Sequence, residues 1–254
     1  MRARGGWAVV QHVPFEGPAL IADALREAGH RVAVHRMWEG DPLPAVDALD
    51  GLVVLGGPMG ALDDAAHPYL KSERELLASA VAAGLPVLGV CLGAQLLAVA
   101  HGAPLHSGAT HEVGTGTVTL TPEAAEDPVF VGVGVGPDRM GTSTVGTGAL
   151  GTSTTGPDPM GAGTTLPVVH WHEDIVGLPA GATLLAHSPL TPVQAFRIGP
   201  RAYGFQFHVE TDRAAAAGLR PHLPAGTELP DAELESIAAT GRRLLRALVA
   251  TTTA

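Results

Sequence analysis

The 254-residue chain is predicted to form an α/β fold with a mostly parallel central sheet flanked by helices, and two patterns support this. Short apolar runs rich in β-branched residues recur in the first half of the chain, with helical or loop segments between them. Residues 76–103 contain no Asp, Glu, Lys or Arg, and their glycines and Pro86 divide them into helix, strand and helix. A charge-free strand of this kind is typical of a parallel sheet that is buried on both faces.

The elements of the first half follow from local patterns. Residues 17–29 carry apolar side chains at helical spacing, and Gly29 stands where a C-cap glycine belongs. Residues 68–83 predict a second helix, which ends at Gly84. Four apolar runs are the expected strands: residues 7–13, 31–35, 51–55 and 85–90.

After residue 102 the pattern changes to strands with few helices. Residues 231–249 are expected to close the chain as an amphipathic helix that packs on the sheet. The whole chain, residues 1–254, is therefore interpreted as one domain. The expected strands of this half are residues 116–121, 168–172, 182–187, 194–198 and 202–209.

A segment at about residues 131–166 consists almost entirely of Gly, Thr, Ser, Val, Pro and other small residues. It offers too little large apolar surface to offset the entropy of ordering it, so we expect a flexible Gly/Thr-rich insertion. Residues 136–141 return in similar form at 156–161, and residues 141–144 return at 151–154. Such duplication is typical of a tolerated surface insertion, and a lid over a functional site is the alternative.

The composition excludes several classes of protein. With 46% hydrophobic and 16% charged residues, the chain has the composition of a folded globular protein. Its formal net charge of -10 repels phosphate backbones and anionic lipid, so we expect neither a nucleic acid nor a membrane as partner. The single cysteine cannot form an intramolecular disulfide, and the N-terminus lacks the apolar stretch of a secretory signal. A cytoplasmic location is expected.

Cys91 lies in a local sequence typical of an enzyme nucleophile. Residues 89–93, Gly-Val-Cys-Leu-Gly, join an expected strand to an expected helix, which is the arrangement of a nucleophile elbow with Cys in place of Ser. The helix start places free amide groups and the positive end of the helix dipole beside the sulfur, which favours the reactive thiolate. A buried, inert cysteine is the alternative.

His208 and Glu210 stand two residues apart at the end of the last expected strand, so their side chains point to the same face. Glu210 can then hold the His208 ring in place. A cysteine with a sequence-distant histidine that a carboxylate orients has the roles of nucleophile, general acid or base, and orienting group. A surface-facing strand end is the alternative for this pair taken alone.

Three motifs occur in a characteristic order: Leu-Gly-Gly-Pro-Met-Gly at 55–60, Pro-Val-Leu-Gly-Val-Cys-Leu-Gly-Ala-Gln at 86–95, and Phe-Gln-Phe-His-Val-Glu at 205–210. Together they resemble the class I, triad-type glutamine amidotransferases, in particular free-standing proteins similar to the amidotransferase domain of GMP synthase. The resemblance spans residues 45–212 outside the insertion. It implies a flavodoxin-like fold and glutamine or a γ-glutamyl compound as substrate.

The resemblance implies a role for each matching residue. Cys91 would attack the carboxamide of glutamine, and His208 would protonate the leaving ammonia and later activate water. Glu210 would orient His208, and a γ-glutamyl thioester would link the two half-reactions. The backbone amides of Gly57 and Leu92 would form the oxyanion hole.

The resemblance also implies substrate contacts at Gln95, His172, Glu173 and Asp174. The sequence departs from the family pattern at Val209, where proline is usual, and at Glu173, where glycine is common. A carboxylate at position 173 can change specificity by its proximity to the substrate α-carboxylate or by pairing with a substrate cation.

The use of the ammonia stays open. These 254 residues contain no ATP-pyrophosphatase signature, so ammonia is expected to pass to a separate synthase subunit or to be released. Release would make the protein a stand-alone hydrolase of γ-glutamyl amides or peptides, which is the first alternative. A non-catalytic module that senses glutamine or binds a partner is the second, and the presence of all three triad residues argues against it.

Two other kinds of site are weighed against this interpretation. His170-x-His172 and His208-x-Glu210 on expected strands offer nitrogen and oxygen ligands that zinc accepts. Residues 56–60 resemble a phosphate loop in glycine content, but no Gly-Lys-Ser/Thr follows and proline removes a donor amide. We therefore expect no metal and no cofactor.

Overall fold

A computed structural model describes residues 5–133 and 163–253, and its centre is the predicted sheet. The described strands form a nine-stranded sheet in the order β2-β1-β3-β4-β11-β10-β9-β6-β7. Five neighbouring strands are parallel: β2 (Val32–Arg36), β1 (Trp7–Gln11), β3 (Gly51–Val54), β4 (Val87–Val90) and β11 (Ala202–Phe205). Antiparallel strands extend one edge: β10 (Ala195–Ile198), β9 (Thr183–His187), β6 (Glu112–Leu120) and β7 (Thr165–His172).

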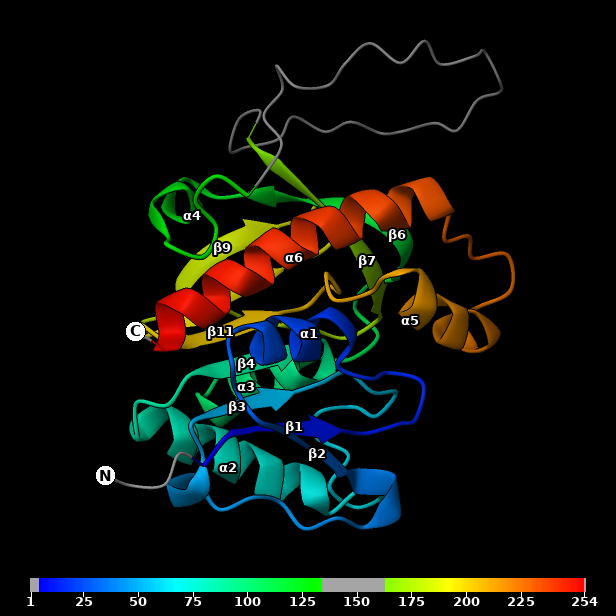
Figure 1. Cartoon of the computed structure of the whole chain (residues 1–254). Coiled ribbons are helices and arrows are strands. Elements are labelled where there is room, and N and C mark those ends of the chain that lie inside the picture. Colours follow the sequence, from blue (N-terminus) through cyan, green and yellow to red (C-terminus); the bar gives the residue numbers. More distant parts are fainter. Residues whose placement is uncertain (1–4, 134–162, 254) are drawn as a thin grey trace, which may run out of the picture.

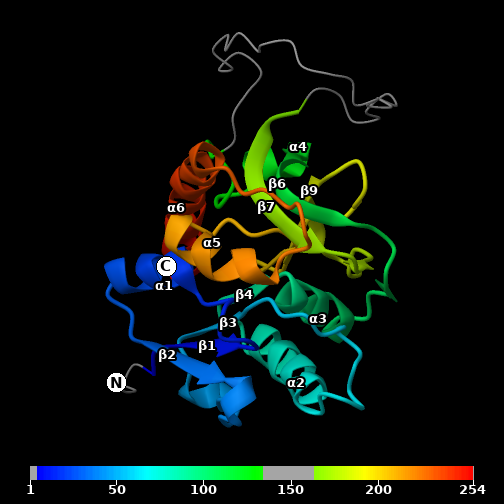
Figure 2. The ribbon, with the colours of Figure 1, turned by 90° about the vertical axis from the view of Figure 1, so that its right-hand side faces the viewer.

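Helices cover both faces of the parallel strands (Figure 1, Figure 2). On one face lie α1 (Ala19–Glu27) and α6 (Asp231–Thr253), and on the other lie α2 (Tyr69–Ala82) and α3 (Leu92–Ala100). Adjacent residues of a strand pack on opposite faces of the sheet, because side chains alternate along a strand. Val9 packs in the core under α1 and α6, and Val10 packs in the core under α2 and α3. All five residues of β1 are buried, as expected for a parallel sheet that helices cover on both sides.

The last helix needs a glycine where it crosses the end of the sheet. A Cβ atom on Gly241 of α6 would lie 1.9 Å from the carbonyl oxygen of Val209. Only hydrogen fits there, so Gly241 permits the close approach of the helix to the segment that carries His208 and Glu210.

Several elements were absent from the sequence-based prediction. Thr121 caps α4 (Pro122–Glu126), because its side chain accepts a hydrogen bond from the amide of Ala124, and Asp212 caps α5 (Arg213–Leu219) in the same way. A small second sheet pairs β5 (Leu105–His106) with β8 (Ile175–Val176). The remaining short elements are the 3-10 turns η1 (Met37–Glu39), η2 (Val46–Ala48) and η4 (Arg220–His222).

The described residues include both ends of the predicted insertion at about 131–166. Val133 is buried in the core, and Leu166 is buried within β7. Residues 134–162, the rest of the predicted segment, lie outside the described residues, as do its internal duplications. Within the described residues, no helix is both long and apolar enough to cross a membrane.

Candidate active site

Cys91 occupies a sharp turn between strand β4 and helix α3. Its backbone has φ 52° and ψ -110°, in the positive-φ region that L-residues rarely adopt and that costs about 1–3 kcal/mol. The turn is held from both sides: the Cys91 amide donates to the carbonyl of Phe205 at 2.7 Å, and the Cys91 carbonyl accepts from the amide of Gln95 at 3.0 Å. The strand–turn–helix geometry predicted around Cys91 is therefore present.

The glycines on either side of Cys91 allow this turn to pack. A Cβ atom on Gly93 would lie 1.9 Å from the carbonyl oxygen of Val54, and one on Gly89 would lie 2.5 Å from the carbonyl oxygen of Gly93. Both contacts involve backbone atoms, which cannot move aside as a flexible side chain does. Larger residues at these positions would separate α3 from the sheet.

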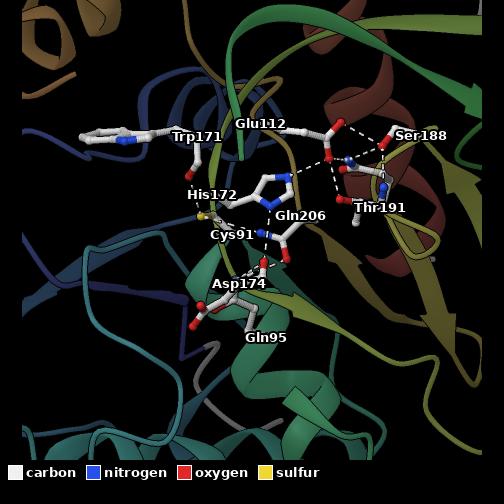
Figure 3. A network of polar contacts seen from close by, with 10 residues as sticks. Cys91, Gln95, Glu112, Trp171, His172, Asp174, Ser188, Thr191 and Gln206 are labelled. Atoms are coloured by element: carbon white, nitrogen blue, oxygen red, sulfur yellow. Dashed lines mark hydrogen bonds and ion pairs between the residues drawn. The ribbon is translucent and has the colours of Figure 1, made fainter. Parts of the chain in front are cut away.

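The Cys91 sulfur has polar neighbours on two sides (Figure 3). Its thiol donates to the carbonyl oxygen of Trp171 at 3.6 Å, and Nε2 of Gln206 donates to the sulfur at 3.9 Å. Cys91 is only 5% exposed, yet it lines a cavity. The sulfur is thus buried, oriented and open to a small ligand.

The residues predicted to complete a triad lie together. Nδ1 of His208 and Oε1 of Glu210 are 2.7 Å apart, and backbone hydrogen bonds in both directions join His208 to Val169 of β7. Burial alone would lower the pKa of His208, but the Glu210 carboxylate and the Cys91 sulfur reverse this, and the pKa is raised well above 6.5. Nε2 of His208 is buried and makes no other hydrogen bond within the described residues.

The two predicted oxyanion donors lie close to this region. Neither the Gly57 amide nor the Leu92 amide makes a hydrogen bond within the described residues, and Leu92 is the first residue of α3. Gly57 and Cys91 line the same cavity. The structure therefore brings two free backbone donors to the neighbourhood of the sulfur.

The cavity beside Cys91 has a volume of about 460 Å³ and lies at the carboxyl ends of the parallel strands, where ligands bind in open α/β sheets. A larger cavity of about 730 Å³ lies at the opposite ends of the strands, against α1 and α6, and the only described cysteine is not among its lining residues. The smaller cavity is lined by Glu16, Gly57, Pro58, Met59, Gly60, Asp63, Cys91, Gln95, Ser107, Val113, Trp171, His172, Glu173, Asp174 and Pro224.

The four predicted substrate-contact residues all line this cavity, but their side chains differ in their partners. Nε2 of Gln95 donates to the carbonyl oxygen of Asp174 and to Oε1 of Gln206, both at 3.2 Å, and its own Oε1 accepts no hydrogen bond within the described residues. Asp174 accepts from the backbone amide of Gly108 at 2.8 Å. Glu173 is exposed at the rim and pairs with His111 at 3.1 Å.

His172 is held within a buried polar network. Its Nε2 lies 3.4 Å from Oε2 of Glu112, and its Nδ1 lies 3.3 Å from the carbonyl oxygen of Asp174. Burial lowers the pKa of His172 to about 4, and Glu112 opposes this shift only in part. His172 is therefore neutral at physiological pH.

Three side chains beside the cavity have the chemistry of metal ligands. Glu112, His170 and His172 offer ligand atoms that lie within 4.8 Å of one another. Glu112, however, already accepts hydrogen bonds from three side chains, so protein donors satisfy this carboxylate: Ser188, Thr191 and Gln194 (Figure 3).

Sequence reasoning missed three residues around Cys91. Gln206 was detectable, because it shares the two-residue period of His208 and Glu210 while the phenylalanines beside it pack in the core. Glu16 lies after β1 and reaches the active site: a Cβ on Gly56 would lie 2.1 Å from its Oε2 and 3.2 Å from Cε1 of His208. Burial raises the pKa of Glu16, while His208 opposes this shift. His12, the third missed residue, contacts the carbonyl oxygen of Gly56 with its Nδ1 and lies beside Gly57.

Comparison with known proteins assigns the family. Residues 18–216 match the family model described as glutamine amidotransferase class-I. The chain belongs to this family. Membership in it accounts for the flavodoxin-like sheet, and it supports hydrolysis of glutamine in general.

Relatives of this class I amidotransferase include a protein of similar length and much longer ones. The glutamine amidotransferase-like protein YfeJ of Salmonella typhimurium is 31% identical over 243 residues, which are 94% of this chain and 86% of YfeJ. The GMP synthase [glutamine-hydrolyzing] of Lactococcus lactis is 26% identical over 200 residues, which are 75% of this chain but only 30% of the synthase.

Solved structures agree with this assignment. A glutamine amidotransferase of Thermotoga maritima superimposes with a TM-score of 0.76 at 25% identity, covering 97% of each chain. One from Methylobacillus flagellatus gives a TM-score of 0.77 at 23% identity, covering 98% of this chain and 96% of the other, and supports the fold alone.

Proposed function

We propose that this amidotransferase hydrolyses the side-chain amide of glutamine, or the amide of a γ-glutamyl compound, through a Cys91-His208-Glu210 triad. The observation that carries the proposal is a strained cysteine on the wall of a cavity, with a carboxylate-bound histidine beside it and with the unbonded amides of Gly57 and Leu92 nearby. This set contains a nucleophile, a proton carrier and an electrostatic stabiliser.

In the first half-reaction, Cys91 gives its thiol proton to Nε2 of His208 and Sγ attacks the amide carbon, so that a C–S bond forms as the carbonyl oxygen gains negative charge. The amides of Gly57 and Leu92 stabilise this oxyanion, and such donors contribute about 10²- to 10³-fold each. His208 donates its proton to the leaving nitrogen, so the C–N bond breaks and ammonia departs. A γ-glutamyl thioester remains on Cys91.

In the second half-reaction, His208 accepts a proton from water, and the oxygen attacks the thioester carbon. The C–O bond forms and the C–S bond breaks, which releases glutamate and regenerates the thiol. Glu210 keeps the His208 ring oriented in both steps, and its negative charge stabilises the protonated ring.

We further propose that the ammonia serves a separate synthase. The GMP synthase of Lactococcus lactis is glutamine-hydrolysing by name, and the chain corresponds to 30% of its length. The likeness to that synthase supports use of the ammonia in a synthetic reaction. The competing possibility, release of the products by a stand-alone γ-glutamyl hydrolase, is an outcome of the experiment that follows.

The test measures release of ammonia or amine from glutamine and from a panel of γ-glutamyl amides and peptides. Wild type is compared with Cys91→Ala and with the control Ser79→Ala, whose side chain bonds only to its own helix. Because Cys91 is the single cysteine in the sequence, a γ-glutamyl adduct found by mass spectrometry on a thiol can be assigned to it.

Cys91-dependent ammonia release from free glutamine would support the glutaminase half-reaction, and stimulation by a synthase would support the partner. Turnover restricted to γ-glutamyl peptides would favour the stand-alone hydrolase. Absence of turnover and of adduct with every substrate would overturn the catalytic proposal and favour a binding module.

A further inference from the structure

A buried pair of charged residues lies behind the loop that carries Gly57. His12 follows β1 and Glu73 lies on α2; Nε2 of His12 is 2.9 Å from Oε2 of Glu73, and both side chains are 0% exposed. On its other side, Nδ1 of His12 is 2.9 Å from the carbonyl oxygen of Gly56. Buried ion pairs are costly to desolvate, and neither residue belongs to the triad.

The hydrogen-bond partners define the protons on the His12 ring. The Gly56 carbonyl can only accept, so Nδ1 carries a proton, and the Glu73 carboxylate accepts the proton of Nε2. Burial alone would lower the pKa of His12, but Glu73, the Gly56 carbonyl and the nearby Glu16 together raise it. The raised pKa favours the protonated ring, which links α2 to the loop after β3.

Holding the Gly56 carbonyl also sets the direction of the Gly57 amide. The peptide between these glycines is planar and trans, so the C=O of Gly56 and the N–H of Gly57 point to opposite sides. His12 occupies the carbonyl side, and a Cβ on Gly57 would lie 2.9 Å from Cβ of His12. The Gly57 amide makes no hydrogen bond within the described residues, and Gly57 lines the active-site cavity.

The Gly56–Gly57 peptide needs contacts that fix its orientation, because two consecutive glycines have the greatest backbone freedom of any dipeptide. Rotation of their peptide would aim a carbonyl oxygen at the position where the oxyanion develops. The attraction between the Gly57 amide and the oxyanion would then be replaced by repulsion between the carbonyl oxygen and the oxyanion. A preorganised donor avoids that reorganisation during the reaction.

We propose that His12 and Glu73 are positioning residues of the oxyanion hole, which hold the Gly56–Gly57 peptide with the Gly57 amide turned toward the substrate carbonyl. The inference rests on the proposed function. Neither side chain touches substrate, so both act through the backbone.

The principal test is the double variant His12→Leu/Glu73→Leu. Removal of only one partner leaves an unpaired buried charge, whereas replacement of both by apolar residues is often neutral for stability. The variant should lose about 10²- to 10³-fold in kcat with KM little changed, the cost typical of one oxyanion donor. Alkylation of Cys91 by iodoacetamide requires no oxyanion hole, so its rate should stay near the wild-type value.

Two further variants separate positioning from general damage. Glu73→Gln keeps an oxygen acceptor for Nε2 of His12 and should retain most of kcat. Asp127→Asn weakens the 2.8 Å pair between half-buried Arg197 and buried Asp127, neither of which lines the cavity, and should lower Tm while kcat is unchanged.

Three results would overturn the inference. These are an unchanged kcat in the double variant, an equal loss of kcat and of Cys91 alkylation, and a crystal structure of the double variant in which the Gly56 carbonyl keeps its direction. The last measurement needs no turnover, so it decides the inference even if no substrate is found. Absence of turnover in the wild type would instead count against the proposed function.

Discussion

Nδ1 of His208 lies 2.7 Å from Oε1 of Glu210, and the two side chains are 4% and 8% exposed. The short contact in a buried setting makes Glu210 the strongest influence that raises the pKa of His208 against the effect of burial. Nε2 of the same ring is left without a hydrogen-bond partner of acceptable geometry among the described residues. One carboxylate thus both orients the ring and favours its protonated form.

Glu210→Gln is expected to lower the pKa of His208, because the amide keeps the shape of the carboxylate but removes its charge. The value of kcat/KM for the substrate should fall by about 10²- to 10⁴-fold, the contribution typical of a positioned acid or base. NMR titration of labelled histidines measures the pKa. The control Glu27→Gln removes an exposed carboxylate paired with Arg246 and should leave His208 unaffected. An unchanged His208 titration in Glu210→Gln would contradict the assigned role.

Glu16→Gln is expected to stabilise the protein at neutral pH. Burial raises the pKa of Glu16 above its ordinary value of 4.5, so the folded carboxyl holds its proton at a higher pH than the unfolded one. Stability is therefore lost as pH rises from 4.5 through the raised pKa. Glutamine mimics the protonated acid, so Tm should increase at neutral pH and change little well below pH 4.5.

The comparison for Glu16→Gln is Glu75→Gln, which replaces an exposed carboxylate on α2 and should change Tm little at either pH. Equal Tm changes for Glu16→Gln at neutral and acidic pH would show that packing, not titration, is responsible. A lower Tm at neutral pH would contradict the predicted sign.

The sequence was most informative where one local pattern sets the structure. Apolar runs placed the parallel strands, and the glycines on either side of Cys91 predicted the elbow. The two-residue period at 206–210 placed His208 and Glu210 on one face. Each of these features depends on a few adjacent residues.

The features that escaped prediction depend on distant parts of the chain. Glu73 occupies one polar position on an amphipathic helix, and only folding places it 2.9 Å from His12, 61 residues earlier. The Gly56 carbonyl, 44 residues from His12, is equally remote in sequence. Spacing rules describe a single helix or strand, so they give no signal for contacts between elements.

Gly93→Ala is expected to destabilise the fold by about 1–3 kcal/mol or more, because its Cβ would lie 1.9 Å from the carbonyl oxygen of Val54. The comparison is Gly218→Ala on α5, where the nearest atom would be 3.9 Å away. Alanine favours a helix over glycine, so this control should be neutral or stabilising by up to about 1 kcal/mol. Urea denaturation measures both, and equal stabilities would contradict the tight packing of the elbow.

His172 predicts a pH dependence of stability on the acidic side. Burial lowers its pKa from 6.5 to about 4 in the folded protein, so between these values the unfolded chain binds more protons than the folded one. The contribution of His172 to the free energy of unfolding is complete above pH 6.5. It is lost as pH falls toward 4, by at most about 1.4 kcal/mol per pH unit.

His172→Gln removes this titration while keeping a polar side chain beside Glu112. The free energy of unfolding, measured by urea denaturation across that pH range, should therefore fall less steeply in the variant than in wild type. His170, whose pKa burial also lowers, contributes the same sign of slope, so part of the wild-type dependence should persist in His172→Gln and diminish further in the double variant with His170→Gln. Parallel curves for wild type and His172→Gln would show that His172 titrates alike in the folded and unfolded states, which its buried position beside Glu112 does not predict.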